Sequence, residues 1–207
     1  GLSMSKTIIT IGRQFGSNGR NIGRKLAEKL SANFYDKELI NETAKESGLS
    51  EEFLKSLDEK PTRSFLYSLV SDPYSYGFTS AGYQTNLNQQ AFQATYDTIK
   101  KLADKGPAVF VGRCADYALR HNTNLVRIFI HSPLEERIKT VSERFNLTPD
   151  KAKTQIVKED KARASYYNYY TSKKWGALES YDIFINSSLM SEDDTVDFII
   201  DYIDKIK

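Results

Sequence analysis

A strand, a glycine-rich loop and a helix follow one another directly near the start of the chain. Residues 7–11 form a short β-branched run that ends at Gly12, a pattern typical of a strand buried on both faces of a parallel sheet. Residues 21–30 carry apolar side chains at every fourth position, which predicts a helix. In an open α/β sheet the loop after such a strand lies where ligands bind, so this unit constrains both fold and function.

The rest of the chain repeats the alternation of strands and helices. Strands are predicted at residues 33–36, 108–111, 125–130 and 181–186, and helices at residues 39–55, 92–105, 134–145, from 149 onward and at the C-terminal end. The helix at residues 134–145 is expected to be preceded by a capping box at Ser132, with Pro133 at its first helical position. Residues 60–88 lose the hydrophobic period, which predicts an insertion or a mobile lobe. Five strands separated by helices predict an α/β fold with a doubly wound parallel sheet.

Charge and cysteine content narrow the function classes. The 207 residues include 29 Lys and Arg against 27 Asp and Glu, and this net charge of +2 gives no support for nucleic-acid or membrane binding. One cysteine and two histidines exclude a disulfide framework and a Cys/His zinc site. No apolar run reaches the roughly 18 residues of a membrane helix. We expect a cytoplasmic protein whose native sequence starts at Met4, with residues 1–3 a remnant in front of it.

The loop after the first strand has the composition of a phosphate cradle. Gly16 and Gly19 allow backbone N–H groups to surround a phosphate, and the next helix presents its positive end. The strict pattern G-x-x-x-x-G-K-[ST] is not met, because Gln14 replaces its first glycine, Arg20 its lysine and Asn21 its hydroxyl residue. A tight turn between strand and helix is the alternative interpretation, although two glycines, a serine and two arginines exceed what a turn requires.

Several motifs, in order along the chain, resemble one family. They are I-T-I-G-R-Q-F-G-S-N-G-R-N-I-G, F-Y-D-K-E-L-I, V-F-V-G-R-C-A-D-Y, D-K-A-R-A-S-Y-Y, W-G and Y-D-I-F-I-N-S-S, spread over residues 6–188. This set resembles the cytidylate-kinase-like family, which is similar to bacterial CMP kinases among the P-loop nucleoside-monophosphate kinases. The resemblance implies one three-layer P-loop NTPase domain over residues 4–207, with a parallel sheet in the order 2-3-1-4-5. It also implies an acceptor-binding helical insertion at about residues 40–95 and a lid at about residues 148–178.

The resemblance also implies a reaction and a set of site residues. ATP is the expected phosphoryl donor, Mg²⁺ the cofactor, and a nucleoside monophosphate, CMP or dCMP first, the acceptor. The expected ATP-binding residues are Arg13, Gly16, Ser17, Asn18, Gly19, Arg20 and Asn21. The expected catalytic residues are Arg20, Asp36, Arg113, Asp160 and Arg163, and the expected acceptor-binding residues are Asp36, Lys37, Arg63, Arg113 and Asp116. No direct metal ligand is assigned, and Asp36 is the candidate for orienting a water of the metal.

Departures from the CMP kinases leave the acceptor open. Those enzymes carry Ser and Arg where this chain has Lys37 and Glu42, and Asp where it has Cys114. Replacement contacts could come from Arg63, Tyr67, Gln84, Asn86 or Asn88. A kinase for a nucleoside or a sugar is therefore an alternative. A non-catalytic nucleotide sensor is another, because Arg20 and Asn21 replace the lysine and hydroxyl of the strict loop.

Several of the same residues also have ordinary structural interpretations. Asp160 and Arg163 lie three apart on a predicted helix and could form an i,i+3 ion pair. Arg13 and Arg113 could each pair with a carboxylate near a strand end. The tyrosines between residues 166 and 170, with Trp175, are expected to pack the lid against the body rather than to stack on nucleic acid. Cys114 is expected to be a small buried side chain.

Overall fold

The computed structural model describes residues 6–36 and 80–206, together with Leu39, Glu42, Lys45, Glu46 and Gly48. Its strands are β1 (Ile8–Arg13), β2 (Asn33–Tyr35), β3 (Ala108–Val111), β4 (Leu125–His131) and β5 (Ile183–Asn186). Its longer helices are α1 (Gly19–Lys29), α5 (Ser80–Ala103), α7 (Leu134–Phe145), α8 (Pro149–Thr171) and α9 (Glu192–Lys205), with the short α6 (Ala115–Ala118) and the 3-10 turn η2 (Leu178–Ser180). The strands are parallel in the order β2-β3-β1-β4-β5, which confirms the predicted topology.

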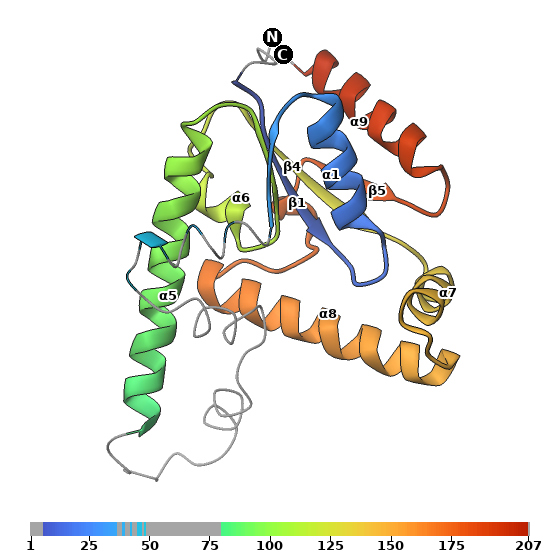
Figure 1. Ribbon diagram of the computed structural model, residues 1–207, viewed down its shortest axis with the longest axis horizontal. Helices are drawn as coiled ribbons and strands as arrows, with labels where there is room; N and C mark the ends of the chain where they lie inside the picture. The colour runs from blue at the N-terminus through green and yellow to red at the C-terminus, as the bar shows by residue number, and fades with distance from the viewer. Residues whose placement is uncertain are drawn as a thin grey trace.

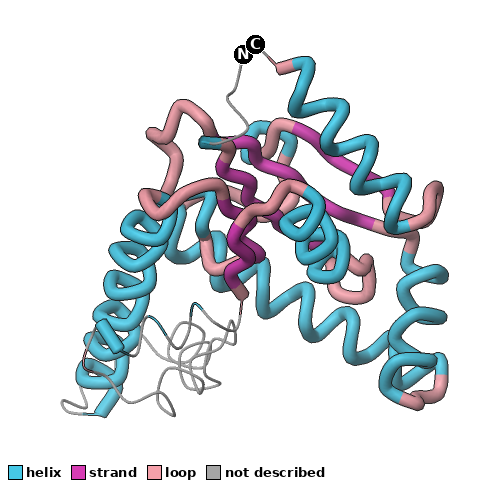
Figure 2. Tube along the Cα trace, turned by 45° about the horizontal axis from the view of Figure 1, so that its top comes forward, coloured by secondary structure: helices cyan, strands magenta, loops and turns pink. Residues whose placement is uncertain are grey.

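Helices cover the sheet on both faces, because side chains of a strand alternate between its two sides. Ile9 and Ile11 of β1 pack with α1 and α9 in one apolar cluster. Ile8 of the same strand packs with α5 and α6 in another. The two views show the resulting layers, with α1 and α9 side by side on one face and α5 on the opposite face (Figures 1 and 2). The carboxyl ends of β1 and β3 point toward α8, which lies along that edge of the sheet (Figure 1).

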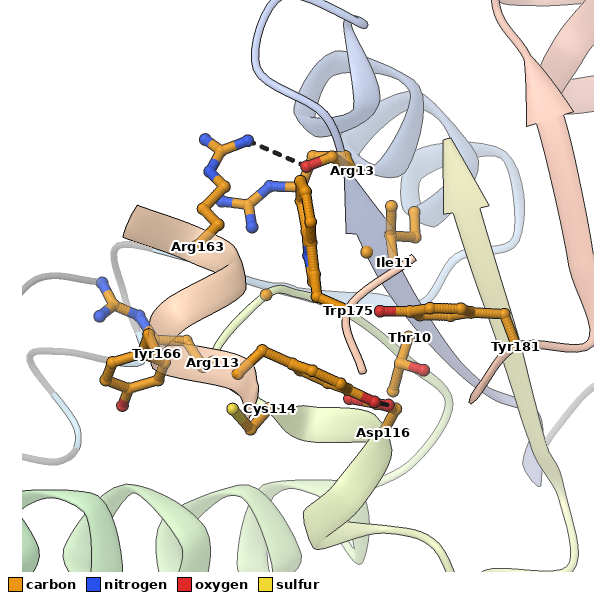
Figure 3. Close-up of a pocket in the computed structure, with 13 residues that line it drawn as sticks. Thr10, Ile11, Arg13, Arg113, Cys114, Asp116, Arg163, Tyr166, Trp175 and Tyr181 are labelled. Atoms are coloured by element: carbon orange, nitrogen blue, oxygen red, sulfur yellow. Dashed lines mark hydrogen bonds between the residues drawn. The ribbon is translucent and has the colours of Figure 1, made fainter. Parts of the chain in front are cut away.

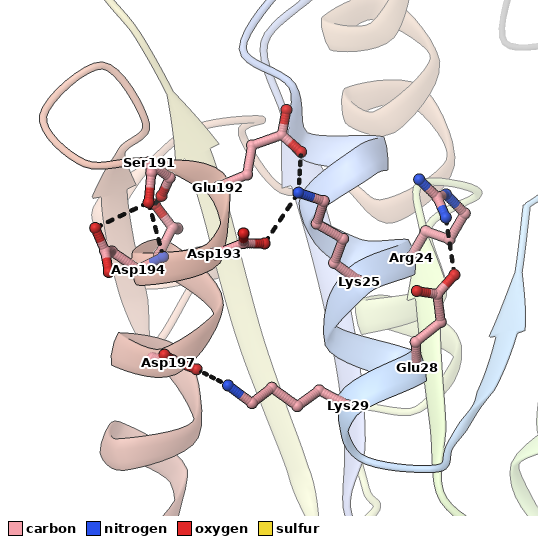
Figure 4. Close-up of polar contacts among 10 residues, drawn as sticks. Arg24, Lys25, Glu28, Lys29, Ser191, Glu192, Asp193, Asp194 and Asp197 are labelled. Atoms are coloured by element: carbon pink, nitrogen blue, oxygen red, sulfur yellow. Dashed lines mark hydrogen bonds and ion pairs between the residues drawn. The ribbon is translucent and has the colours of Figure 1, made fainter.

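Ion pairs join α9 to α1 along their exposed sides (Figure 4). The ammonium of Lys25 lies 3.0 Å from Asp193 and 3.5 Å from Glu192, and Lys29 pairs with Asp197. Burial of Val196 and Ile199 beneath them supplies the apolar part of this contact. The last helix is therefore attached to the helix that follows the glycine loop.

Two helix starts differ from the predictions. The helix expected at 92 begins at Ser80, because its first turns are polar and carry no hydrophobic period that a sequence reading could detect. The capping box at Ser132 is wrong: α7 starts at Leu134 after Pro133, without a side-chain cap. The backbone of Ser132 instead accepts a hydrogen bond from Arg137 and donates one to Gln14.

Other predictions about local structure are confirmed. Thr148 caps α8 by accepting a hydrogen bond from the Lys151 N–H, with Pro149 as the first residue of the helix. The strand at 108–111 has its predicted bounds. Most of the predicted helix over 39–55 and most of the predicted insertion lie outside the described residues, although Leu39, Glu42, Lys45 and Glu46 are helical. In the described part of the chain, no helix combines the length and the apolar character that crossing a membrane requires.

Candidate active site

The glycine loop, residues 13–18, joins β1 to α1 at the carboxyl edge of the sheet. Gly16 adopts a φ of +83°, and a Cβ added to it would lie 2.9 Å from Val141 Cγ2 and 3.2 Å from Arg137 Cβ. A side chain at this position would be strained by the left-handed backbone conformation and would also clash with α7. Gly19 is equally enclosed, because its Cβ would lie 2.5 Å from that of Arg13. The two glycines thus have steric reasons to be glycine.

Side chains from later elements hold the outer part of the glycine loop. The Ser187 hydroxyl, after β5, donates to the carbonyl of Ser17 over 2.7 Å. Arg144 of α7 donates to the side-chain oxygen of Asn18 over 2.6 Å, and Asn18 has a left-handed φ of 63°. The hydroxyl of Ser17 itself is directed at the Gln14 carbonyl. The side chain of Ser17 is thus engaged within the loop itself.

The inner part of the glycine loop is held by α7 and α8. The Phe15 N–H donates to Asp160 Oδ1 over 2.7 Å, and the Phe15 carbonyl accepts from Arg137 at 3.3 Å. Arg137 also pairs with Asp160 Oδ2 at 2.7 Å. Arg163, one turn further along α8, donates to the Arg13 carbonyl over 3.1 Å and lies 5.4 Å from the centre of the Phe15 ring. Asp160 of α8 therefore forms its ion pair with Arg137 of α7, a residue of another helix.

At the start of α1, Arg20 stands where a P-loop has its lysine. Its Nε donates to Asp36 Oδ2 over 2.6 Å, and its guanidinium lies 5.8 Å from the centre of the Phe34 ring. The Arg20 side chain is 45% exposed, whereas that of Asp36 is 15% exposed. Asn21 follows in the first turn of α1 and is half-buried. The structure thus brings together Arg20 and Asp36, two residues predicted to act in one site.

A pocket opens between the ends of β1 and β3 and the side of α8, and three arginines line it (Figure 3). Arg13 comes from the end of β1, Arg113 from the turn after β3, and Arg163 from α8. An apolar wall of the same pocket is formed by aromatic rings, among them those of Trp175 and Tyr166. Guanidinium groups are suited to bidentate contact with phosphate or carboxylate oxygens. Three of the predicted site arginines thus line one pocket, whereas Arg20, which pairs with Asp36, is not among its lining residues.

The deep end of the pocket holds a buried carboxylate. Asp116 accepts a hydrogen bond of 2.6 Å from the Tyr167 hydroxyl, and only 7% of Asp116 is exposed. Burial raises the pKa of Asp116, and the hydrogen bond from Tyr167 opposes that shift. Burial next to Asp116 also raises the pKa of the Tyr167 and Tyr181 hydroxyls, so both stay protonated near neutrality. The Thr10 hydroxyl lies beside this group, buried and without a hydrogen-bond partner.

The turn after β3 has an unusual backbone. Gly112, Arg113 and Cys114 have consecutive φ values of 72°, 59° and 55°. Two successive non-glycine residues in the left-handed region cost free energy, and such strain is found most often at functional sites. This backbone places Arg113 and Cys114 on the pocket, with Cys114 buried as predicted.

Aromatic residues attach α8 to the body of the protein, as the sequence predicts. The Tyr170 ring stacks on Phe92 of α5 with centroids 4.2 Å apart, and Tyr166 meets Phe92 edge-on. Trp175 packs edge-on against Phe129 of β4 at 5.2 Å. Burial raises the pKa of Tyr170 to about 12. This cluster fixes the part of α8 that carries Arg163.

Some predicted residues lie outside the described residues, and some contributors were missed. Lys37, Arg63 and Tyr67 are not described, nor are the side chains of Gln84 and Asn86. The missed contributors are Thr10, Arg137, Arg144, Tyr181 and Ser187. For Arg137 one signal was present, since it precedes the buried Val141 by four residues and therefore shares its helix face.

Comparison with known proteins identifies the family of this chain. The model of the cytidylate kinase-like family matches residues 8–189, which is most of the chain. The chain belongs to the cytidylate kinase-like family. It is 23% identical over 209 residues to a cytidylate kinase of Methanopyrus kandleri, covering 96% of this chain and 94% of that one. It is also 23% identical to a cytidylate kinase of Staphylothermus marinus, covering 96% and 97% of the two chains.

Solved structures of other proteins share the fold of this chain. An uncharacterized protein from Eubacterium ventriosum superposes with a TM-score of 0.72 at 31% identity, covering 97% of this chain and 99% of that one. A shikimate kinase from Bacteroides thetaiotaomicron has a TM-score of 0.53 at 14% identity, covering 96% and 98%. The chain has the P-loop kinase fold of the shikimate kinases.

Proposed function

We propose that this cytidylate kinase-like protein transfers the terminal phosphoryl group of ATP to a nucleoside monophosphate, with CMP or dCMP as the first choice. The observation that supports this most directly is the pocket with Arg13, Arg113 and Arg163 beside the glycine loop. Phosphoryl transfer depends mainly on positioning and on neutralising charge, which arginines from three separate elements supply. The matching relatives named cytidylate kinase support the choice of acceptor.

Each cationic group has a role in this proposal. Arg20 and the amides of the glycine loop hold the β- and γ-phosphates of ATP at the positive end of α1. Arg113, at the carboxyl end of β3, holds the phosphate of the acceptor. Arg163 stabilises negative charge on the group in transit. In this proposal α8 belongs to a lid at about residues 148–178, and residues 40–95 supply acceptor contacts, Lys37 and Arg63 among the nearby candidates.

The residues present fit a magnesium ion held mainly by the nucleotide. Mg²⁺ usually keeps several waters and takes only one or two carboxylates. Among the described residues no group of three or more His, Cys, Asp or Glu side chains could hold a metal. In this proposal Asp36, which accepts a hydrogen bond from Arg20, would hold a water of the ion. When bound with ATP, the ion would neutralise charge on the β- and γ-phosphates.

A coupled assay across acceptors tests the proposal. ATP and Mg²⁺ are combined with CMP, dCMP, UMP, AMP and GMP, and in parallel with cytidine, shikimate and simple sugars. We expect turnover with CMP or dCMP and little with the acceptors that carry no phosphate. Turnover with a neutral sugar and with no monophosphate would overturn the assignment.

One observation favours a second candidate, a nucleotide sensor without efficient transfer. Arg20 is engaged by Asp36, whereas the lysine of a P-loop has to reach the phosphates. Calorimetry distinguishes the two functions. ATP binding without phosphoryl transfer to any acceptor of the panel would favour the sensor.

A further inference from the structure

Arg137, which is buried, and Asp160, which is partly buried, form an ion pair at the inner side of the glycine loop. Only 7% of Arg137 is exposed, and the Asp160 side chain is 19% exposed. The Arg137 guanidinium donates to Asp160 at 2.7 Å, to the Ser132 carbonyl at 2.9 Å and to the Phe15 carbonyl at 3.3 Å. The second oxygen of Asp160 accepts the Phe15 N–H at 2.7 Å. The pair therefore binds both backbone polar groups of one loop residue.

The same arginine also restricts the next residue of the loop. The space that a Cβ of Gly16 would need is bounded by the Cβ and the carbonyl oxygen of Arg137, each 3.2 Å away. Hydrogen bonds at Phe15 and steric contact at Gly16 leave this stretch little freedom to rotate. Removing two charges from water is costly, and apolar residues of similar size often stabilise a fold equally well. A contribution to stability alone is therefore a weak explanation for the presence of this ion pair.

We infer that Arg137 and Asp160 are positioning residues that set the shape of the glycine loop for the nucleotide. In this inference Asp160 acts through the Phe15 N–H rather than by contact with the transferred phosphoryl group. The pair also links α7 and α8 to the loop, so that the position of α8 and the shape of the loop depend on each other. This inference rests on the proposed function, because it takes the loop to be the binding site of the ATP phosphates.

A double variant separates positioning from stability. Removing one partner alone leaves a buried charge unpaired and is expected to destabilise the fold strongly. In Arg137→Met/Asp160→Leu both charges are gone and the space stays filled, so we expect a melting temperature close to wild type. We expect amide exchange at Phe15, followed by NMR without nucleotide, to accelerate at least about tenfold. Calorimetry should show ATP binding weakened by about 10- to 100-fold, because the loop is no longer held in one shape.

Glu136→Gln is the matched control. It alters the neighbouring position of α7, where Glu136 pairs with Lys139 on the exposed side, and should leave both Phe15 exchange and ATP affinity unchanged. Wild-type exchange and affinity in the double variant would overturn the inference. A wild-type protein that binds no ATP would instead overturn the proposed function, while the exchange measurement would still test whether the pair holds the loop.

Discussion

At the residue scale, the proposed phosphoryl transfer depends most directly on Arg20 at the start of α1. Its side chain is 45% exposed and its contact with Asp36 is an ion pair near the surface, so it contributes little to folding. We expect Arg20→Ala to lower kcat by about 100-fold or more, as for loss of other groups that stabilise transition-state charge, while the melting temperature stays nearly constant. The coupled assay and a thermal melt of the same sample check this. Unchanged turnover would remove Arg20 from the proposed mechanism.

Gly16 allows a second prediction at this scale. Gly16→Ala combines a φ of +83° with a 2.9 Å approach to Val141, whereas Gly176→Ala has a φ of +72° but an ordinary 3.5 Å contact with Phe129. The backbone cost of about 1–2 kcal/mol is common to both variants. We expect Gly16→Ala to lose more stability than Gly176→Ala in urea unfolding. Equal losses would show that α7 yields to the added methyl group.

At the scale of elements, the hydrogen bond from Tyr167 to Asp116 connects α8 with α6. Tyr167→Phe leaves the buried carboxylate without this donor and should destabilise the protein by about 1–3 kcal/mol at pH 7. When the pKa of a carboxyl is higher in the folded than in the unfolded protein, the protein loses stability as the pH rises between these two pKa values. Loss of the Tyr167 donor raises the folded-state pKa of Asp116 further. The deficit should therefore shrink as pH falls toward the unfolded pKa of about 4. Urea unfolding at pH 4 and pH 7 measures it, and Tyr169→Phe on the exposed side of α8 is the control.

The helices and strands also show which parts of the fold could be predicted from the sequence. The strands and α8 could be predicted, since apolar runs and a Thr148 cap leave local signals. The start of α5 could not, because its first turns are polar. The candidate site shows the same division: Gly16 and Arg20 belong to a local motif. Arg137 and Tyr181 act through contacts distant in the sequence, which no single-sequence pattern encodes.

At the scale of the whole molecule, attachment of α9 to α1 combines apolar burial with exposed charge pairs. Exposed pairs are screened by salt, whereas apolar burial is not. We expect Lys25→Gln/Lys29→Gln to lower the melting temperature slightly in dilute buffer, with the difference disappearing at about 1 M NaCl. Thermal melts across a salt series test this. A deficit that persists at high salt would mean that the lysine stems, rather than their charges, make the contact.

Trp175 is the only tryptophan in the sequence, and it lines the arginine pocket with its ring edge-on to Phe129. The tryptophan fluorescence of this protein, excited where tyrosine does not absorb, therefore reports on one position. A ligand entering the pocket should change the emission of Trp175 without any label being attached. Separate titrations with ATP and with each monophosphate, followed by the emission of Trp175, would thus show which of these ligands enters the pocket.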